Sequence, residues 1–306
     1  MTMTSSEGRS TNYELRTTNK TGKSEQPPVP IRSLYFVVRS FVYHLVALTI
    51  VALFVLPFVG VIGWSLRQPG LPPPRGLEWL PDPIAWGNYT RIFEIVPLLR
   101  YTRNSFLVVA VAVPLTIVTA SWAGLSMALL SPRLRKPLLL LAVLLRLVPV
   151  TALWLTRFVL FARLGLLDSL WALVIPALMG SSPFFVLLYY WTFRRVPTSI
   201  FESARLDGAG TLRLWARVAL PLARPTTVTV AVLTFVLYWR DFITPLLYLR
   251  SEEWQTLPVG LRALQQVSRT DWPLLLAGSV VMTAPIVLLF LLAQRSFWPE
   301  DRVGGR

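Results

Sequence analysis

The sequence predicts an all-α integral membrane protein with six transmembrane helices. Hydrophobic residues make up 54% of the 306 residues and charged residues only 15%, whereas a soluble domain has about 25% charged residues. The apolar residues gather in long runs, and a helix needs about 20 of them to cross a bilayer. Because these runs show no alternation of polar and apolar residues, a closed β-barrel is excluded.

The composition also excludes several functions. The formal net charge is +15, but the lysines and arginines are scattered through short segments between apolar runs, so nucleic acid is not an expected partner. The chain has no cysteine and a single histidine, His44. There is no pair of histidines for a metal site, and no Ser-His-acid set stands in an obvious place. We therefore expect no bound metal, no catalytic residue and no enzymatic activity of the chain's own.

Six segments are long and apolar enough to be transmembrane helices. Four of them carry no charge and two carry internal charges; they lie at 40–66, 104–132, 169–193 and 272–294, and at 137–162 and 225–249. The chain then divides into a disordered cytoplasmic tail, a first transmembrane helix, an external loop, a five-helix core that contains a cytoplasmic loop, and a second cytoplasmic tail. Their predicted bounds are 1–38, 39–66, 67–103, 104–297 with the loop at 194–224, and 298–306.

The distribution of basic residues predicts the orientation in the membrane. If the N-terminus is cytoplasmic, the segments on that side carry 18 lysines and arginines and the segments on the other side carry 9. Loops rich in lysine and arginine stay on the cytoplasmic side of a membrane. We therefore expect both termini and the polar loop at 194–224 to be cytoplasmic.

Four charged residues lie inside the predicted spans, where an ionisable group is costly and usually faces the interior of the bundle. Arg146 and Arg157 are three helical turns apart, so a continuous helix would place them on one face. Arg240 and Asp241 lie near the outer end of the fifth span. These side chains can serve assembly, by snorkelling or by pairing with a carboxylate, or they can contact a solute.

Two aromatic residues, Tyr238 and Trp239, directly precede Arg240 and Asp241. An aromatic side chain offers an apolar face for stacking, which suits the apolar face of a sugar ring, while the hydroxyl groups of the sugar need charged or polar acceptors. The segment 238–241 is therefore predicted to line a solute path.

The predicted cytoplasmic loop contains the stretch "PTSIFESARLDGAG", residues 197–210. Ser199 followed by Glu202 is typical of a capping box, and Gly208 can adopt the left-handed conformation that ends a helix. The stretch therefore predicts a helix over 200–206. Because two turns are too short to be stable alone in water, we expect this helix to dock on a partner. The expected docking surface combines an exposed Phe201 with other apolar and charged side chains, namely Ile200, Ala204, Glu202, Arg205 and Asp207.

The same loop matches a spacing pattern. Glutamate, two small residues, a glycine, an aliphatic residue and Leu-Pro occur here as Glu202-Ser203-Ala204, Gly208, Val218 and Leu220-Pro221. In this pattern the chain resembles the permease subunits of binding-protein-dependent ABC importers, in which alanine usually stands at the position of Ser203. The segments "YWRDFITPLLYL" and "QTLPVGL" are similar to segments of the family's carbohydrate branch, the maltose and glycerol-phosphate type. Arg240 replaces the asparagine that is usual in that branch.

The resemblance implies a type I ABC importer permease fold in the inner membrane of a prokaryotic cell. It also implies a division of labour, in which a dimer of ABC ATPase subunits binds ATP and Mg, a second and non-identical permease completes the path, and an external binding protein delivers a sugar or oligosaccharide. This chain would bind no cofactor. Importers of a polyol phosphate, an amino acid or a peptide remain alternatives, as does a channel or receptor. The residues implied in ATPase coupling are Ser199, Phe201, Glu202, Ala204, Arg205, Asp207, Gly208, Leu220 and Pro221.

Overall fold

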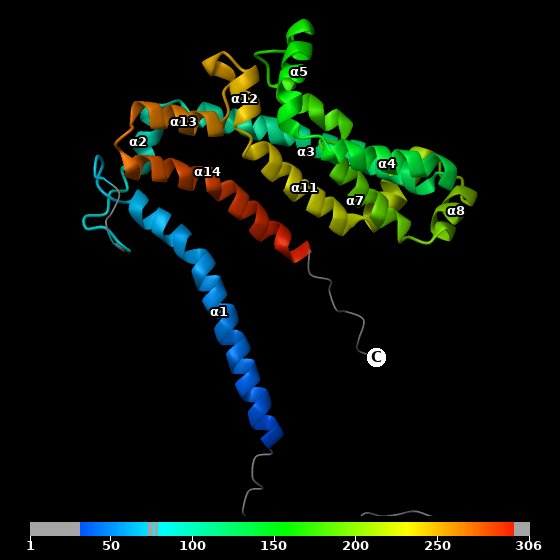
Figure 1. Cartoon of the computed structure of the whole chain (residues 1–306), viewed down its shortest axis with the longest axis horizontal. Coiled ribbons are helices and arrows are strands. Elements are labelled where there is room, and N and C mark those ends of the chain that lie inside the picture. Colours follow the sequence, from blue (N-terminus) through cyan, green and yellow to red (C-terminus); the bar gives the residue numbers. More distant parts are fainter. Residues whose placement is uncertain (1–30, 73–75, 77–78, 297–306) are drawn as a thin grey trace, which may run out of the picture. The chain divides into compact units, whose positions relative to one another are not determined.

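The computed structural model describes residues 31–72, 76 and 79–296. The predicted tail at 298–306 and most of the predicted tail at 1–38 lie outside the described residues. Within the described part, every regular element is helical (Figure 1). The chain divides into two units, Met1–Leu56 and Pro57–Arg306, and each is described by itself.

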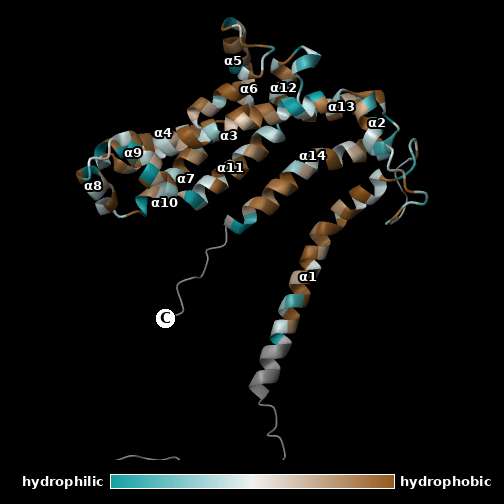
Figure 2. Ribbon diagram, turned by 180° about the vertical axis from the view of Figure 1, so that it is seen from behind, coloured by the Kyte–Doolittle hydropathy of each residue, from teal (hydrophilic) through white to brown (hydrophobic). Residues whose placement is uncertain are grey.

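The first described element is helix α1, Ile31–Ser65, which contains the unit boundary. It begins before residue 39, the predicted start of the first transmembrane helix, because the apolar residues between Ile31 and Val38 extend the helical pattern. Its segment Arg39–Ser65 is long and apolar enough to cross a membrane, and hydrophobic residues line it over most of that length (Figure 2).

The second unit contains the remaining helices and helical turns. The α-helices are α2 (Asn88–Ile95), α3 (Leu98–Leu129), α4 (Pro132–Leu147), α5 (Val150–Arg163), α6 (Trp171–Val174), α7 (Pro183–Arg194), α8 (Thr198–Leu206), α9 (Thr211–Leu214), α10 (Leu220–Leu222), α11 (Arg224–Trp239), α12 (Ile243–Tyr248), α13 (Leu257–Val267) and α14 (Trp272–Ala293). The shorter turns are η1 (Ile175–Met179), η2 (Trp215–Ala219), η3 (Glu252–Trp254) and η4 (Gln294–Ser296).

Helix α3 is the central element of the second unit. It packs against α7, α11 and α13, and at 1.5 Å per residue its 32 residues extend over roughly 48 Å. Gly124 allows a close approach to α7, since a Cβ atom there would lie 2.6 Å from the Cβ atom of Tyr189. Gly260 does the same for α13 against the ring of Tyr101. Two glycines therefore set the distance of α3 from its neighbours.

The predicted span at 137–162 is broken. Helix α4 ends at Leu147, α5 begins at Val150, and the two helices are bent by 94°. Pro149 lies at the break; it lacks an N–H group and disfavours helical geometry in the residue before it. The prediction that Arg146 and Arg157 share one helical face is therefore wrong, because the two arginines belong to different helices.

The predicted span at 225–249 is also interrupted. Helix α11 ends at Trp239 and α12 begins at Ile243, which leaves Arg240 and Asp241 in a non-helical break. Within the described residues, four helical segments are long and apolar enough to cross a membrane. The number rises to six if each of two bent pairs counts as one span. These pairs are Pro132–Leu147 with Val150–Arg163, and Thr211–Leu222 with Arg224–Trp239, which is bent by 86°. The predicted all-helical fold with several membrane spans is confirmed.

Candidate functional sites

Helix α8 lies in the 194–224 loop and ends at a glycine with left-handed backbone geometry. Gly208 has φ of +78°. The N–H of Gly208 donates to the carbonyl oxygen of Arg205 over 3.0 Å, and the N–H of Ala209 donates to that of Ala204, also over 3.0 Å. This pair of hydrogen bonds is a Schellman motif, which satisfies carbonyl groups at a helix end. The predicted helix and its glycine stop are confirmed.

The inward face of α8 differs from the prediction. Phe201 is only 2% exposed and packs in a buried cluster with Phe193 and Leu214, so the expectation of an exposed Phe201 is wrong. The capping box is also wrong, because Pro197 precedes the first residue of the helix and provides no side-chain hydrogen bond, while Ser199 lies inside the helix. Phe201 therefore anchors α8 to the second unit and is not free to contact a partner.

The outward face of α8 carries the predicted charges and one residue that the sequence analysis did not select. Glu202, Arg205 and Asp207 are exposed, and Ala204 is half-buried on the inward side. Leu206 is 89% exposed, although a large apolar side chain is usually covered. Leu206 lies four residues after Glu202, which places it one helical turn further along the same face. This spacing could have identified Leu206 as part of the docking surface.

The rest of the loop is held against α3. The indole nitrogen Nε1 of Trp215 donates to Oγ of Ser121 over 2.9 Å, and the rings of Trp215 and Trp122 stack with centroids 5.3 Å apart. Leu220 is half-buried and Pro221 is exposed in the short helix α10. The 194–224 loop is thus a folded layer on the end of α3, in which Trp215 has a positioning role that the sequence pattern did not indicate.

A second site lies inside the apolar unit, where helices α3 and α11 meet the short link between η1 and α7 that contains Ser181. The hydroxyl groups of Thr116, Ser181 and Tyr238 form a chain, with 2.5 Å between the oxygens of Thr116 and Ser181 and 3.0 Å between those of Ser181 and Tyr238. We call these three residues the hydroxyl cluster. Arg157 on α5 lies close enough to Tyr238 and Asp241 for electrostatic interaction with both.

The other residues of the predicted solute path behave differently. Asp241 is half-buried, and its Oδ1 accepts a hydrogen bond from the N–H of Thr244 over 3.2 Å, so it stabilises the start of α12. Arg240 is exposed. Trp239 is fully buried, and its Nε1 donates to the carbonyl oxygen of Met282 over 2.9 Å. Trp239 is therefore a core residue, and the prediction that it lines a solute path does not agree with its position in this chain.

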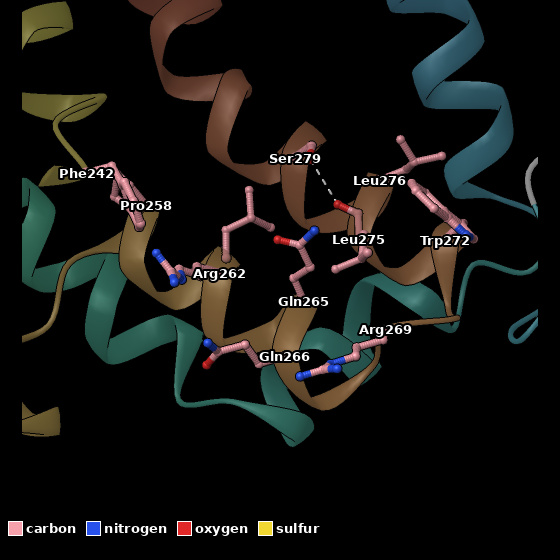
Figure 3. A pocket seen from close by; sticks show the side chains of 11 residues that line it. Phe242, Pro258, Arg262, Gln265, Gln266, Arg269, Trp272, Leu275, Leu276 and Ser279 are labelled. Carbon is pink, nitrogen blue, oxygen red and sulfur yellow. Dashed lines mark hydrogen bonds between the residues drawn. The ribbon is translucent and has the colours of Figure 1, made fainter. Parts of the chain in front are cut away.

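A cavity of about 850 Å³ lies between α13 and α14 (Figure 3). One wall is a polar stripe of α13 and the other is the first half of α14, and the guanidinium of Arg262 lies 5.5 Å from the centre of the Phe242 ring. Gly278 allows this close pairing of the two helices, since a Cβ atom there would lie 2.7 Å from Leu261. The polar side chains that line the cavity are Arg262, Gln265, Gln266, Arg269 and Ser279.

A carboxylate joins the loop after α5 to the loop after α12. Oδ1 of Asp168 accepts hydrogen bonds from the N–H groups of Arg250 and Ser251 over 2.9 and 2.8 Å, and Oδ2 accepts one from the hydroxyl of Ser251. These hydrogen bonds hold the pKa of Asp168 below its usual value, and the side-chain bond from Ser251 is the largest cause. Asp168 therefore fixes the geometry of two loops that are far apart in sequence.

The fold and the loop together define the membrane-spanning component of a transport system. Several apolar helices surround the hydroxyl cluster, and a short helix projects charged and apolar groups from one end of the unit. The chain belongs to the family of binding-protein-dependent transport system inner membrane components, whose family model matches residues 117–297. The resemblance to ABC importer permeases that the sequence suggested is confirmed.

Similar proteins include several with carbohydrates in their names. The arabinooligosaccharides transport system permease protein AraQ of Halalkalibacterium halodurans is 30% identical over 254 residues, which cover 82% of this chain and 90% of that protein. The sulfoquinovosyl glycerol transport system permease protein SmoH of Agrobacterium fabrum is 28% identical over 81% of this chain and 87% of its own length. The maltodextrin transport system permease protein MdxG of Bacillus subtilis is 29% identical over 71% of this chain and 79% of its own length.

A solved structure supports the fold. A chain of a bacterial ABC transporter that imports the acidic polysaccharide alginate superposes with a TM-score of 0.68 at 18% identity, and the match covers 89% of this chain and 99% of that chain. At this identity the likeness concerns the fold alone. The chain is thus a multi-pass membrane protein with the fold of an ABC importer permease.

Proposed function

We propose that this chain is the permease subunit of an ATP-driven importer of a sugar or oligosaccharide. The observation that carries the proposal is α8, a two-turn helix that is anchored by a buried Phe201, ended by Gly208 and free to contact a partner through Glu202 and Leu206. A helix of this length needs tertiary contacts to be ordered, and here those contacts leave its charged face exposed.

Two observations support a carbohydrate as the solute. The relatives AraQ, SmoH and MdxG are named for arabinooligosaccharides, sulfoquinovosyl glycerol and maltodextrin. Tyr238 of the hydroxyl cluster lies close enough to Asp241 and Arg157 for electrostatic interaction, and such hydroxyl and charged groups are suitable partners for sugar hydroxyls. We assign the solute path to Tyr238 and Asp241, with Arg157 beside them, and leave Trp239 to the core.

The proposed division of labour gives ATP and Mg to a dimer of ABC ATPase subunits that dock on α8. A second, non-identical permease would complete the path, and an external binding protein would deliver the solute. One similar structure is an alginate ABC transporter in complex with a periplasmic protein that holds an alginate pentasaccharide. This chain would then be a non-catalytic subunit, and closure of the ATPases would move α8 as a rigid body.

The proposed location is the cell membrane of a prokaryote, with both termini and α8 in the cytoplasm. The excess of lysine and arginine on the α8 side supports this orientation. Reporter fusions at Arg306 and within 70–85 test it: the first should report a cytoplasmic position and the second an external one. An external C-terminus would contradict the orientation and the docking of a cytoplasmic ATPase.

Reversal of one charge on α8 tests the proposed function. We expect Glu202→Lys to abolish most of the solute-stimulated ATP hydrolysis and uptake of the reconstituted complex, because truncating or reversing one partner of a charge pair at an interface costs roughly 2–5 kcal/mol. Glu94→Lys is the matched control, since Glu94 is also exposed but lies on α2. Equal coupled transport by both variants would show that α8 is only a linker.

A further inference from the structure

The strongest unassigned feature is a cavity of about 360 Å³ at the α8 end of the second unit. It lies between the last turns of α3 and α7, the first turn of α4, and α8. Its apolar wall consists of residues at the end of α3 and the start of α4, such as Leu130 and Pro132. Its polar wall consists of three arginines from three helices and one acid, namely Arg135, Arg194, Arg205 and Glu202.

The charges around this cavity are strongly unbalanced. Arg133 and Lys136 flank Arg135 in the first turns of α4, and Arg195 follows Arg194 at the end of α7. Within the part of the chain that the structure describes, the ion pair joins Arg91 and Asp271, which lie on other elements. None of the basic residues around the cavity therefore has a carboxylate partner among the described residues. The first turn of α4 also has no acidic residue, although the positive end of its helix dipole lies among the cations.

An apolar track continues from the cavity along α4. Four leucines at spacings of four, three and four residues lie on one helical face, and each is exposed: Leu134 by 58%, Leu138 by 39%, Leu141 by 51% and Leu145 by 51%. Leu138 is about one turn from Arg135. A cationic cavity at the end of membrane helices, joined to an apolar strip that runs into the bilayer, matches a molecule with a charged head and a hydrocarbon tail.

We propose that this cavity binds the headgroup phosphate of an anionic phospholipid, with an acyl chain along the leucines of α4. Guanidinium groups bind phosphate by paired hydrogen bonds, and basic pockets between membrane helices bind anionic lipid headgroups. The bound lipid would contact Arg205 on α8, so its occupancy would bear on the helix that we assign to coupling. A free phosphate has the same charge but makes no use of the leucine track.

Two double variants with equal loss of charge test the proposal. Arg135→Gln with Arg194→Gln removes two cations that line the cavity, and Arg133→Gln with Arg195→Gln removes two cations from the same helix ends that do not line it. The full chain is purified in detergent with its associated subunits, and bound phosphatidylglycerol is measured by native mass spectrometry during titration. We expect affinity on the order of tenfold lower for the first pair and about unchanged for the second.

Further measurements separate the alternatives. Equal loss of lipid in both double variants would overturn the proposal, because the lipid would then be attracted by the general positive charge of these helix ends and not by the cavity. Displacement of phosphatidylglycerol by inorganic phosphate would assign the cavity to a free anion. Retained lipid with weakened ATPase co-purification in the first variant would assign it to the ATPase. If that variant does not assemble, the single variants Arg135→Gln and Arg194→Gln should each bind the lipid more weakly than Arg133→Gln; equal affinity in the assembled complexes would contradict the proposal.

Discussion

Leu206 and Phe201 lie five residues apart on α8, yet the structure predicts opposite consequences for their removal. Leu206 is 89% exposed and Phe201 is 2% exposed. Burial of a leucine side chain in a partner is worth about 1.5–3 kcal/mol, and Leu206→Ala removes most of that. We therefore expect the affinity for the ATPase to fall by about 2 kcal/mol, which is roughly 30-fold, while the thermal stability of the permease stays unchanged.

Phe201→Ala acts on the fold itself. A buried phenylalanine replaced by alanine costs about 3–5 kcal/mol, because the transfer free energy of the ring is lost and a cavity is left. The variant should therefore lower the unfolding temperature of the purified subunit and increase protease sensitivity in the 194–224 loop. The assays are thermal unfolding in detergent and titration of the ATPase onto immobilised permease. The assignment of Leu206 to the docking face and of Phe201 to the core would be refuted by two results together. These are normal affinity of Leu206→Ala for the ATPase, and weakened affinity with normal thermal stability in Phe201→Ala.

Three further predictions follow from local geometry. Gly208→Val should uncouple transport from ATP hydrolysis, because a side chain at a left-handed position costs roughly 1–2 kcal/mol. Gly210→Val is the control and should be tolerated, because Gly210 has φ of −65°. Equal uptake by the two variants would contradict this prediction. Asp241→Asn should lower uptake in vesicles without loss of assembly, and normal uptake would remove Asp241 from the path. Asp168→Ala should speed amide exchange at Ser251, and unchanged exchange would show that Asp168 does not hold the two loops together. In the parent chain the pKa of Asp168 is lowered, so its carboxylate stabilises the folded loops at pH values above its unfolded pKa. This stabilisation is lost as the pH falls through the folded pKa.

The sequence was sufficient for features that depend on neighbouring residues. Apolar runs of membrane length predicted the helices, because each run satisfies its own backbone groups. The stop at Gly208 was also predictable, because a left-handed residue after a helix is a local requirement that glycine meets without strain. The same holds for the position of α8, which the stretch 197–210 and its glycine predicted, although the capping box expected at Ser199 and Glu202 is not formed.

Features that depend on distant segments could not be predicted in this way. The pattern of a two-turn helix does not say which neighbour covers Phe201, so its burial against Phe193 required the fold. Thr116 and Tyr238 come from two helices and Ser181 from the link between η1 and α7, and no spacing in the chain encodes their contact. The break near Pro149 was visible only as a proline that a membrane helix can also tolerate with a bend.

The contacts of α3 offer a short mechanical connection between the 194–224 loop and the proposed solute path. Trp215 is hydrogen-bonded to Ser121, and Thr116 of the hydroxyl cluster is five residues earlier on the same helix, a rise of about 7.5 Å. Gly124 brings α3 so close to α7 that independent sliding of the two helices would create a clash, because packed cores move as units. A displacement of the loop would therefore reach the hydroxyl cluster through one rigid pair of helices. Gly124→Leu forces this pair apart and should impair coupled uptake in vesicles, although it substitutes no residue of α8 or of the cluster; normal uptake would argue against this connection.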